Sequence, residues 1–89
     1  MMNKLWIATP SGFRKTYSLR IEHEDEVVVQ KFKEVVLNEG SEFKPVVQRQ
    51  ESNKCYIEFY NSHEEGFDDK MIAFAERIAK VVEMEIDID

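Results

Sequence analysis

The stretch FDDKMIAFAERIAKVV, residues 67–82, decides the fold. Its bulky apolar side chains recur at the three- and four-residue steps that place them on one face of a helix. Aspartate, glutamate, lysine and arginine occupy most of the remaining positions. The stretch therefore predicts a long amphipathic helix whose buried face carries Phe67, Met71, Phe74, Ile78 and Val82.

The segments on either side of this helix predict how it begins and which element comes next. Ser62 and Glu65 have the S-x-x-E spacing of a capping box, although Gly66 leaves the first helical residue open. From Val82 to Asp89, apolar and acidic residues alternate strictly. Because a strand turns successive side chains to opposite faces, this alternation predicts a C-terminal strand with one acidic face.

The N-terminal half of the chain predicts two strands and a first helix. Lys4–Thr9 and Tyr17–Ile21 are short runs of bulky residues, and the turn-forming residues 10–12 lie between them. A helical spacing of valine and phenylalanine begins at Val27 and stops before Gly40, which suits a helix C-cap. The acids that precede Val27 complement the positive end of the helix dipole.

Two more strands are predicted between the helices. Phe43–Gln50 is the first, and Pro45 indicates an edge position or a strand start. In the second, Cys55, Ile57 and Phe59 alternate with polar and aromatic residues, so these three side chains should share a buried face.

These elements describe an α+β domain, and residues 1–89 are too few for a second core. Their order is ββαββα(β). We expect an antiparallel sheet of four or five strands with two helices on one face, because this arrangement buries both helical stripes. The predicted core consists of Leu19, Ile21, Val28, Phe32, Val36, Ile57, Phe59, Phe67, Phe74 and Ile78.

The composition is that of a small acidic protein. The 89 residues include 18 Asp and Glu against 12 Lys and Arg, a net charge of −6, and 43% are hydrophobic, which argues against intrinsic disorder. No apolar run approaches the ~20 residues of a membrane span, and residues 1–10 lack the apolar core of a secretory signal. A single cysteine suits a reducing compartment. We therefore expect a cytoplasmic protein that has no contact with a membrane.

Little in the sequence indicates catalysis. It contains no glycine-rich phosphate loop, no Ser-His-Asp arrangement and no H-E-x-x-H motif. Cys55 is predicted to be buried, and burial in apolar surroundings makes a thiol inert. The sequence therefore predicts a protein that is not an enzyme and holds no cofactor.

A metal site is one alternative. His23 and His63 are each followed by acids, and imidazole and carboxylate groups bind zinc or manganese. The two histidines are far apart in the sequence, so only the tertiary fold could bring them together. The competing interpretation is that these acids simply complement helix N-termini, and we prefer it.

A nucleic-acid-binding module is the second alternative. The N-terminal hairpin is basic, because residues 1–21 contain four cations and no acid. Arg14, Lys15 and Arg20 could contact phosphates, and Phe13 and Trp6 could stack on bases. The negative net charge of the whole chain argues against this role.

Two acidic clusters favour a different role. Net negative charge repels nucleic acid and attracts basic proteins. On a strand, the acids of residues 82–89 would form a ladder with a repeat of ~6.7 Å, close to the spacing of phosphates along a nucleic-acid strand. Charges on an edge strand also prevent aggregation, and this interpretation stays open. The predicted partner-binding residues are Glu83, Glu85, Asp87 and Asp89 of the ladder and Glu64, Glu65, Asp68 and Asp69 near the second helix.

The leading hypothesis is a small acidic, non-enzymatic interaction domain that docks on a basic protein. Charge mimicry could let it block a nucleic-acid-handling protein, as inhibitors made by phages or mobile elements do, although size and charge alone support this comparison. An exposed edge strand, or the aromatic strand face with Tyr56 and Tyr60, could also support a homodimer.

Overall fold

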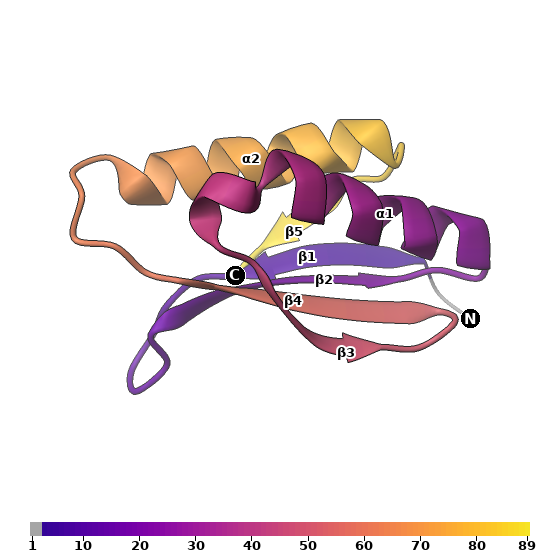
Figure 1. Cartoon of the computed structure of the whole chain (residues 1–89), viewed down its shortest axis with the longest axis horizontal. Helices are drawn as coiled ribbons and strands as arrows, with labels where there is room; N and C mark the ends of the chain where they lie inside the picture. Colours follow the sequence, from indigo (N-terminus) through magenta and orange to yellow (C-terminus); the bar gives the residue numbers. More distant parts are fainter. Residues whose placement is uncertain (1–2) are drawn as a thin grey trace.

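The computed structural model describes residues 3–89, and its elements follow the predicted order (Figure 1). None of the helices in these residues is long and apolar enough to cross a membrane. The elements are β1 (Lys4–Ala8), β2 (Thr16–Glu22), α1 (Glu26–Glu39), a short 3₁₀ helix η1 (Ser41–Phe43), β3 (Val46–Gln50), β4 (Lys54–Tyr60), α2 (Phe67–Val81) and β5 (Ile86–Ile88).

The five strands form one sheet in the order β3-β4-β2-β1-β5. The prediction of a purely antiparallel sheet is wrong, because β5 pairs with β1 in parallel. The crossover through α2 explains this difference. Because α2 runs back along the sheet, β5 has the same direction as β4. β1 also has this direction, because β2 is antiparallel to both β1 and β4.

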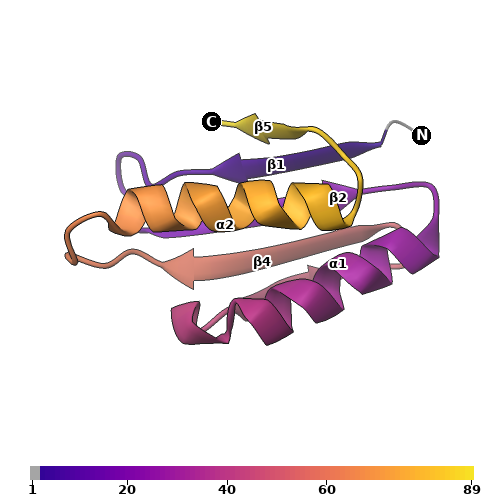
Figure 2. The same cartoon turned by 90° about the horizontal axis from the view of Figure 1, so that it is seen from above.

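Both helices cover the same face of the sheet, as predicted (Figure 2). In Figure 2, α2 crosses above the middle of the sheet and α1 lies along the β4 side. The opposite face has no helix over it (Figure 1). The core lies between the helices and the sheet, and it contains nine of the ten predicted residues, all except Val28.

The buried face of α1 differs slightly from the prediction. Val29, Phe32 and Val36 are fully buried, whereas Val28 is only partly buried against the core. The helix is capped at its start by Asp25, whose carboxylate accepts a hydrogen bond from the Val27 N–H at 2.9 Å. Val29, Phe32 and Val36 have the i, i+3, i+7 spacing of one helical face, so Val29 and not Val28 lies at the centre of the buried stripe.

The end of α1 confirms Gly40 as the C-cap, since its N–H donates to the Val36 oxygen at 2.9 Å. The strand predicted from Phe43 begins later, at Val46. Phe43 belongs to η1, where its ring packs against the core, and Pro45 immediately precedes the strand. The predicted edge position of β3 is confirmed.

The capping box predicted for α2 does not form. The Ser62 hydroxyl accepts a hydrogen bond from the Glu64 N–H at 3.1 Å, and the helix starts only at Phe67. Gly66 separates the two segments, with a φ of 78° that favours glycine. The apolar stripe itself is confirmed, because Phe67, Met71, Phe74, Ile78 and Val82 are all buried.

The C-terminal strand is shorter than predicted. The alternation of residues 82–89 predicts a strand from Val82 onward, but Val82 caps α2, and β5 covers only Ile86–Ile88. Glu83 has a φ of 56°, and the Met84 N–H donates to the Ala79 oxygen at 3.0 Å. This is the pattern of a helix that closes with a left-handed residue. Val82 extends the buried apolar stripe of α2. Its burial in the core stabilises the helical end there, although the sequence alternates as in a strand.

Cys55 is buried in β4, with 1% of its surface exposed, and burial raises the pKa of its thiol to about 11. We expect native Cys55 to react with a disulfide reagent at pH 8 at least about 100-fold more slowly than in the unfolded chain. The rate of reagent colour release with and without denaturant measures this difference. Equal rates would mean that the thiol is exposed and that β4 faces the other way.

Candidate functional site

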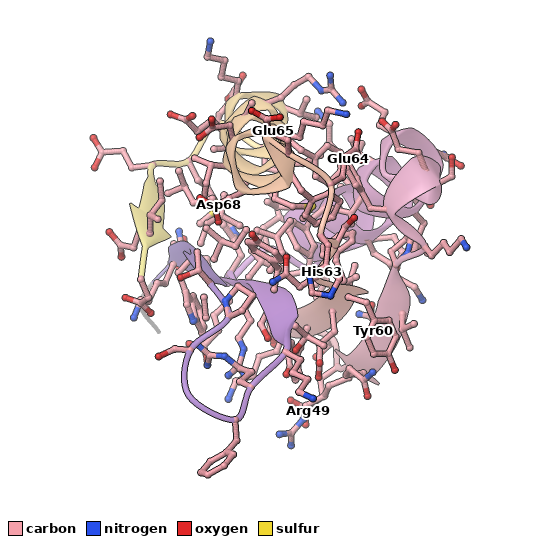
Figure 3. The ribbon with its side chains drawn as sticks, turned by 90° about the vertical axis from the view of Figure 1, so that its left-hand side faces the viewer. Arg49, Tyr60, His63, Glu64, Glu65 and Asp68 are labelled. Carbon is pink, nitrogen blue, oxygen red and sulfur yellow. The ribbon has the colours of Figure 1, made fainter. Side chains whose placement is uncertain are left out.

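The charges are divided unevenly between the two hairpins and the rest of the chain. The hairpins β1–β2 and β3–β4, turns included, hold six of the 12 cations but only three of the 18 acids. The helices, their connections and β5 therefore hold six cations and 15 acids. Figure 3 shows Arg49 on the side of the sheet away from the helices, and Glu64 and Glu65 near the start of α2. The two hairpins therefore carry a net positive charge, and the acids are concentrated in the rest of the chain.

An acidic hollow of about 470 Å³ lies between the end of β1 and the start of α2. Three carboxylates, those of Glu64, Asp68 and Asp69, line it together with the hydroxyl-bearing Thr9 and Tyr17. No Lys or Arg from residues 3–89 is among the lining residues. The acidic hollow can therefore accept a cationic group.

Asp68 is held in place by a buried tyrosine. Tyr17 is 2% exposed, and its hydroxyl donates to Asp68 Oδ1 at 2.6 Å. Burial, and then the nearby Asp68 carboxylate, raise the pKa of Tyr17 to about 12. The phenol therefore stays protonated at neutral pH and keeps donating to Asp68, which makes one wall of the acidic hollow rigid.

The other two carboxylates of the acidic hollow have no buried hydrogen-bond partner among residues 3–89. Glu64 Oε1 accepts a hydrogen bond from Lys70 Nζ at 2.8 Å, in an ion pair whose side chains are both about half exposed. Such an exposed pair contributes little stability and can exchange partners. Asp69 lies in the first turn of α2 and is exposed.

The structure brings one residue of the C-terminal acidic cluster close to the acidic hollow. The N–H and the hydroxyl of Thr9 both donate to the Asp89 backbone oxygen, at 3.2 and 2.7 Å. Since Thr9 lines the acidic hollow, Asp89 lies adjacent to it. Glu65 is exposed near the same end of α2 (Figure 3).

The remaining predicted acids lie elsewhere, so the ladder of four acids is wrong. Glu83 belongs to the turn that ends α2, and only Asp87 lies within β5. Glu83, Glu85 and Asp87 line a separate hollow of about 380 Å³, where Lys4 and His23 accompany them. The ladder fails because the chain enters β5 only after the helix has closed.

The two histidines of the metal-site hypothesis are at opposite ends of the sheet. His23 follows β2 at the end where Glu22 pairs with Lys54, and His63 follows β4 beyond the pairing of Thr16 with Tyr60. A strand of this length spans about 20 Å. Residues 3–89 contain no group of three His, Cys, Asp or Glu side chains that could hold a metal ion. The fold does not bring together the residues that this hypothesis needs.

The basic residues predicted to contact nucleic acid also divide into two places. Phe13 is fully exposed in the β1–β2 turn, and the Arg14 guanidinium donates to the Thr9 oxygen at 2.6 Å. Trp6 and Arg20 lie instead side by side on the uncovered face of the sheet, where they form a cross-strand pair. Trp6 points away from the core, because its neighbours Leu5 and Ile7 are buried.

Sequence reasoning missed Tyr17 and Thr9 as parts of the acidic hollow. The alternation of β2 indicates only which face Tyr17 occupies, and the residue is buried there, but its hydroxyl reaches Asp68 in another element. Only a long-range contact reveals this role. No model of a known family matches the chain, and no curated protein and no solved structure is significantly similar to it.

Proposed function

We propose that this protein is a small, non-enzymatic interaction domain that docks on a basic protein through the acidic hollow. The observation that carries the proposal is the convergence of Glu64, Asp68 and Asp69 on one concave site, where, among residues 3–89, the Glu64 carboxylate pairs only with the exposed Lys70. A lysine or arginine side chain of a partner would form charge-assisted hydrogen bonds there.

The charge of the surroundings supports the same role. The helices, their connections and β5 hold 15 acids and six cations, and this excess of negative charge attracts a basic surface over long distances and raises the association rate. A protein that handles nucleic acid carries such a surface. Occupation of its basic groove by this domain would block it by charge mimicry, the mode of action of an inhibitor of the kind that phages or mobile elements make.

Neutralising part of the acidic hollow should weaken binding. The probe is a fluorescent decalysine peptide, followed by anisotropy at low salt. In the double variant Glu64→Gln and Asp69→Asn, we expect about tenfold weaker binding, because two of the three carboxylates no longer pair with the cations. Asp68 is left unchanged because it also holds Tyr17.

The matched control is the double variant Glu83→Gln and Glu85→Gln, which removes the same charge at the other hollow. We expect it to bind the peptide within about twofold of the wild type. Equal losses in the two double variants would mean that the peptide senses only overall charge, and would contradict docking in the acidic hollow. Circular dichroism verifies that both variants remain folded.

A further inference from the structure

The uncovered face of the sheet carries one continuous row of aromatic and guanidinium groups. The strand register places Trp6 opposite Arg20, Arg20 opposite Tyr56, and Tyr56 opposite Arg49. Asp87 of β5 continues the row on the other side of Trp6. All of them point away from the helices, because the neighbouring residues in β1, β2 and β4 are buried in the core.

The planar groups in this row lie against one another. The Arg20 guanidinium carbon is 4.0 Å from the centroid of the Tyr56 ring, and Lys4 Nζ is 4.6 Å from that of Trp6. Trp6, Arg20, Tyr56 and Arg49 line a shallow hollow of about 220 Å³. The face therefore offers flat, half-buried surfaces next to positive charge.

A hydrogen-bonded network holds Tyr56 in position. Its hydroxyl donates to Glu58 Oε1 at 2.6 Å, and Ser18 donates to the same hydroxyl at 3.2 Å. Thr16 donates to Glu58 Oε2 at 2.7 Å. The hydrogen bonds from Tyr56 and Thr16 lower the pKa of Glu58, so that the carboxylate stays charged and keeps accepting them. Arg20 Nε is buried and has no hydrogen-bond partner among residues 3–89.

Three of the acids on this side are already engaged by other groups, and Asp87 of β5 adds a fourth negative charge beside Trp6. Glu58 is engaged by the network, Glu51 pairs with Arg49 at 3.3 Å and Glu22 pairs with Lys54 at 3.8 Å. Both ion pairs are solvent-exposed, and a phosphate can displace the carboxylate from such a pair at little cost. Lys4, Arg49 and Lys54 therefore surround the aromatic row as potential phosphate ligands.

We infer that this uncovered face, centred on Trp6, Arg20 and Tyr56, binds single-stranded nucleic acid. Unstacked bases lie on aromatic rings and guanidinium planes, and every base has such a face, so binding of this kind depends little on sequence. From Trp6 to Arg49 the row crosses three strand spacings, about 14 Å, which suits two or three bases. A duplex keeps its bases stacked and cannot use a flat face in this way.

This binding site goes beyond the proposed function, because it uses the opposite side of the molecule and a ligand of opposite charge. The net charge of −6 repels the nucleic-acid strand at long range, so we expect weak binding that declines with salt. With four cations near the row, the slope of log K against log salt should not exceed about 3 in magnitude.

Trp6 is the only tryptophan, so its fluorescence reports directly on stacking at the row. The probes are single strands of about 12 nucleotides, as DNA and as RNA, and a DNA duplex, in about 50 mM salt. We expect both single strands to quench the fluorescence of Trp6. When the strands carry a fluorescent label, the anisotropy of that label should rise on binding. The duplex should show neither effect. No quenching and no anisotropy change with either single strand, or equal binding of the duplex, would overturn the inference.

Paired variants separate this face from the rest of the molecule. Trp6→Ala should weaken single-strand binding about tenfold by anisotropy, whereas Phe13→Ala at the exposed turn should leave it unchanged. Arg49→Ala should weaken it and reduce the salt slope by about 0.7, whereas Arg77→Ala, which removes a similarly exposed arginine from α2, should not. Loss in Phe13→Ala without loss in Trp6→Ala would overturn the inference, as would equal losses in both arginine variants.

Discussion

Replacing Phe74 with alanine is expected to lower the free energy of unfolding by about 3–5 kcal/mol. The ring is 3% exposed, and its centroid lies 5.3 Å from that of Phe43 and 6.0 Å from that of Phe59. It therefore joins α2 to η1 and β4, and its removal leaves a cavity where three elements meet. Domains of this size have about 5–15 kcal/mol of stability in total, so the variant should unfold at much lower urea concentration.

The matched control for this prediction is Phe13→Ala, which removes the same side chain where it is fully exposed. We expect its unfolding free energy to stay within about 0.5 kcal/mol of the wild type. Urea titrations followed by circular dichroism measure both variants. If the midpoint for Phe74→Ala equals that of the wild type, the core is not organised around the helical stripe of α2.

Replacing Gly40 with alanine is expected to cost about 1–3 kcal/mol by overpacking. A Cβ at this position would lie 2.6 Å from the Val36 oxygen and 2.7 Å from Phe74 Cζ, closer than such atoms approach in proteins. The φ of Gly40 is −95°, which any residue adopts, so the cost arises from this collision and not from backbone strain. Denaturant titration of the single variant measures it.

A double-mutant cycle tests the cause of this effect. In a Phe74→Leu background the aromatic ring is absent, so adding Gly40→Ala should cost at least about 0.5 kcal/mol less than it does in the wild type. The Val36 oxygen remains close in both backgrounds. Strictly additive effects would show that the Phe74 ring does not restrict position 40.

The order of elements and most of the core could be predicted because they depend on local periodicity. The stripe of α2 and the alternation in β2 and β4 bury the predicted residues without any long-range information. The parallel pairing of β5 could not be predicted in this way, because strand direction depends on where α2 returns the chain. The capping box expected before α2 does not form because Ser62 accepts a hydrogen bond within its own loop, and local spacing does not distinguish the two arrangements.

The candidate sites were less predictable than the fold. The eight acids form two clusters in the sequence, but the tertiary structure groups them differently. Asp89 lies beside the acidic hollow that contains Asp68, and Glu83 lies in the separate hollow with Lys4. The row across the uncovered face depends on the register of five strands. Arg49 enters it only because the pairing of β3 with β4 shifts between Val47 and Arg49.

The pairing of β5 with β1 has a consequence for the folding pathway. The hydrogen bond from the Thr9 hydroxyl to the Asp89 oxygen joins residues 80 positions apart, so this contact must close a loop of almost the whole chain. Only three residues form β5, so few contacts offset the loss of chain entropy that closing this loop requires. We therefore expect the contact to form after the folding transition state, once α2 has docked. The edge of β1 that β5 covers should then be protected late in folding and should open early by local unfolding.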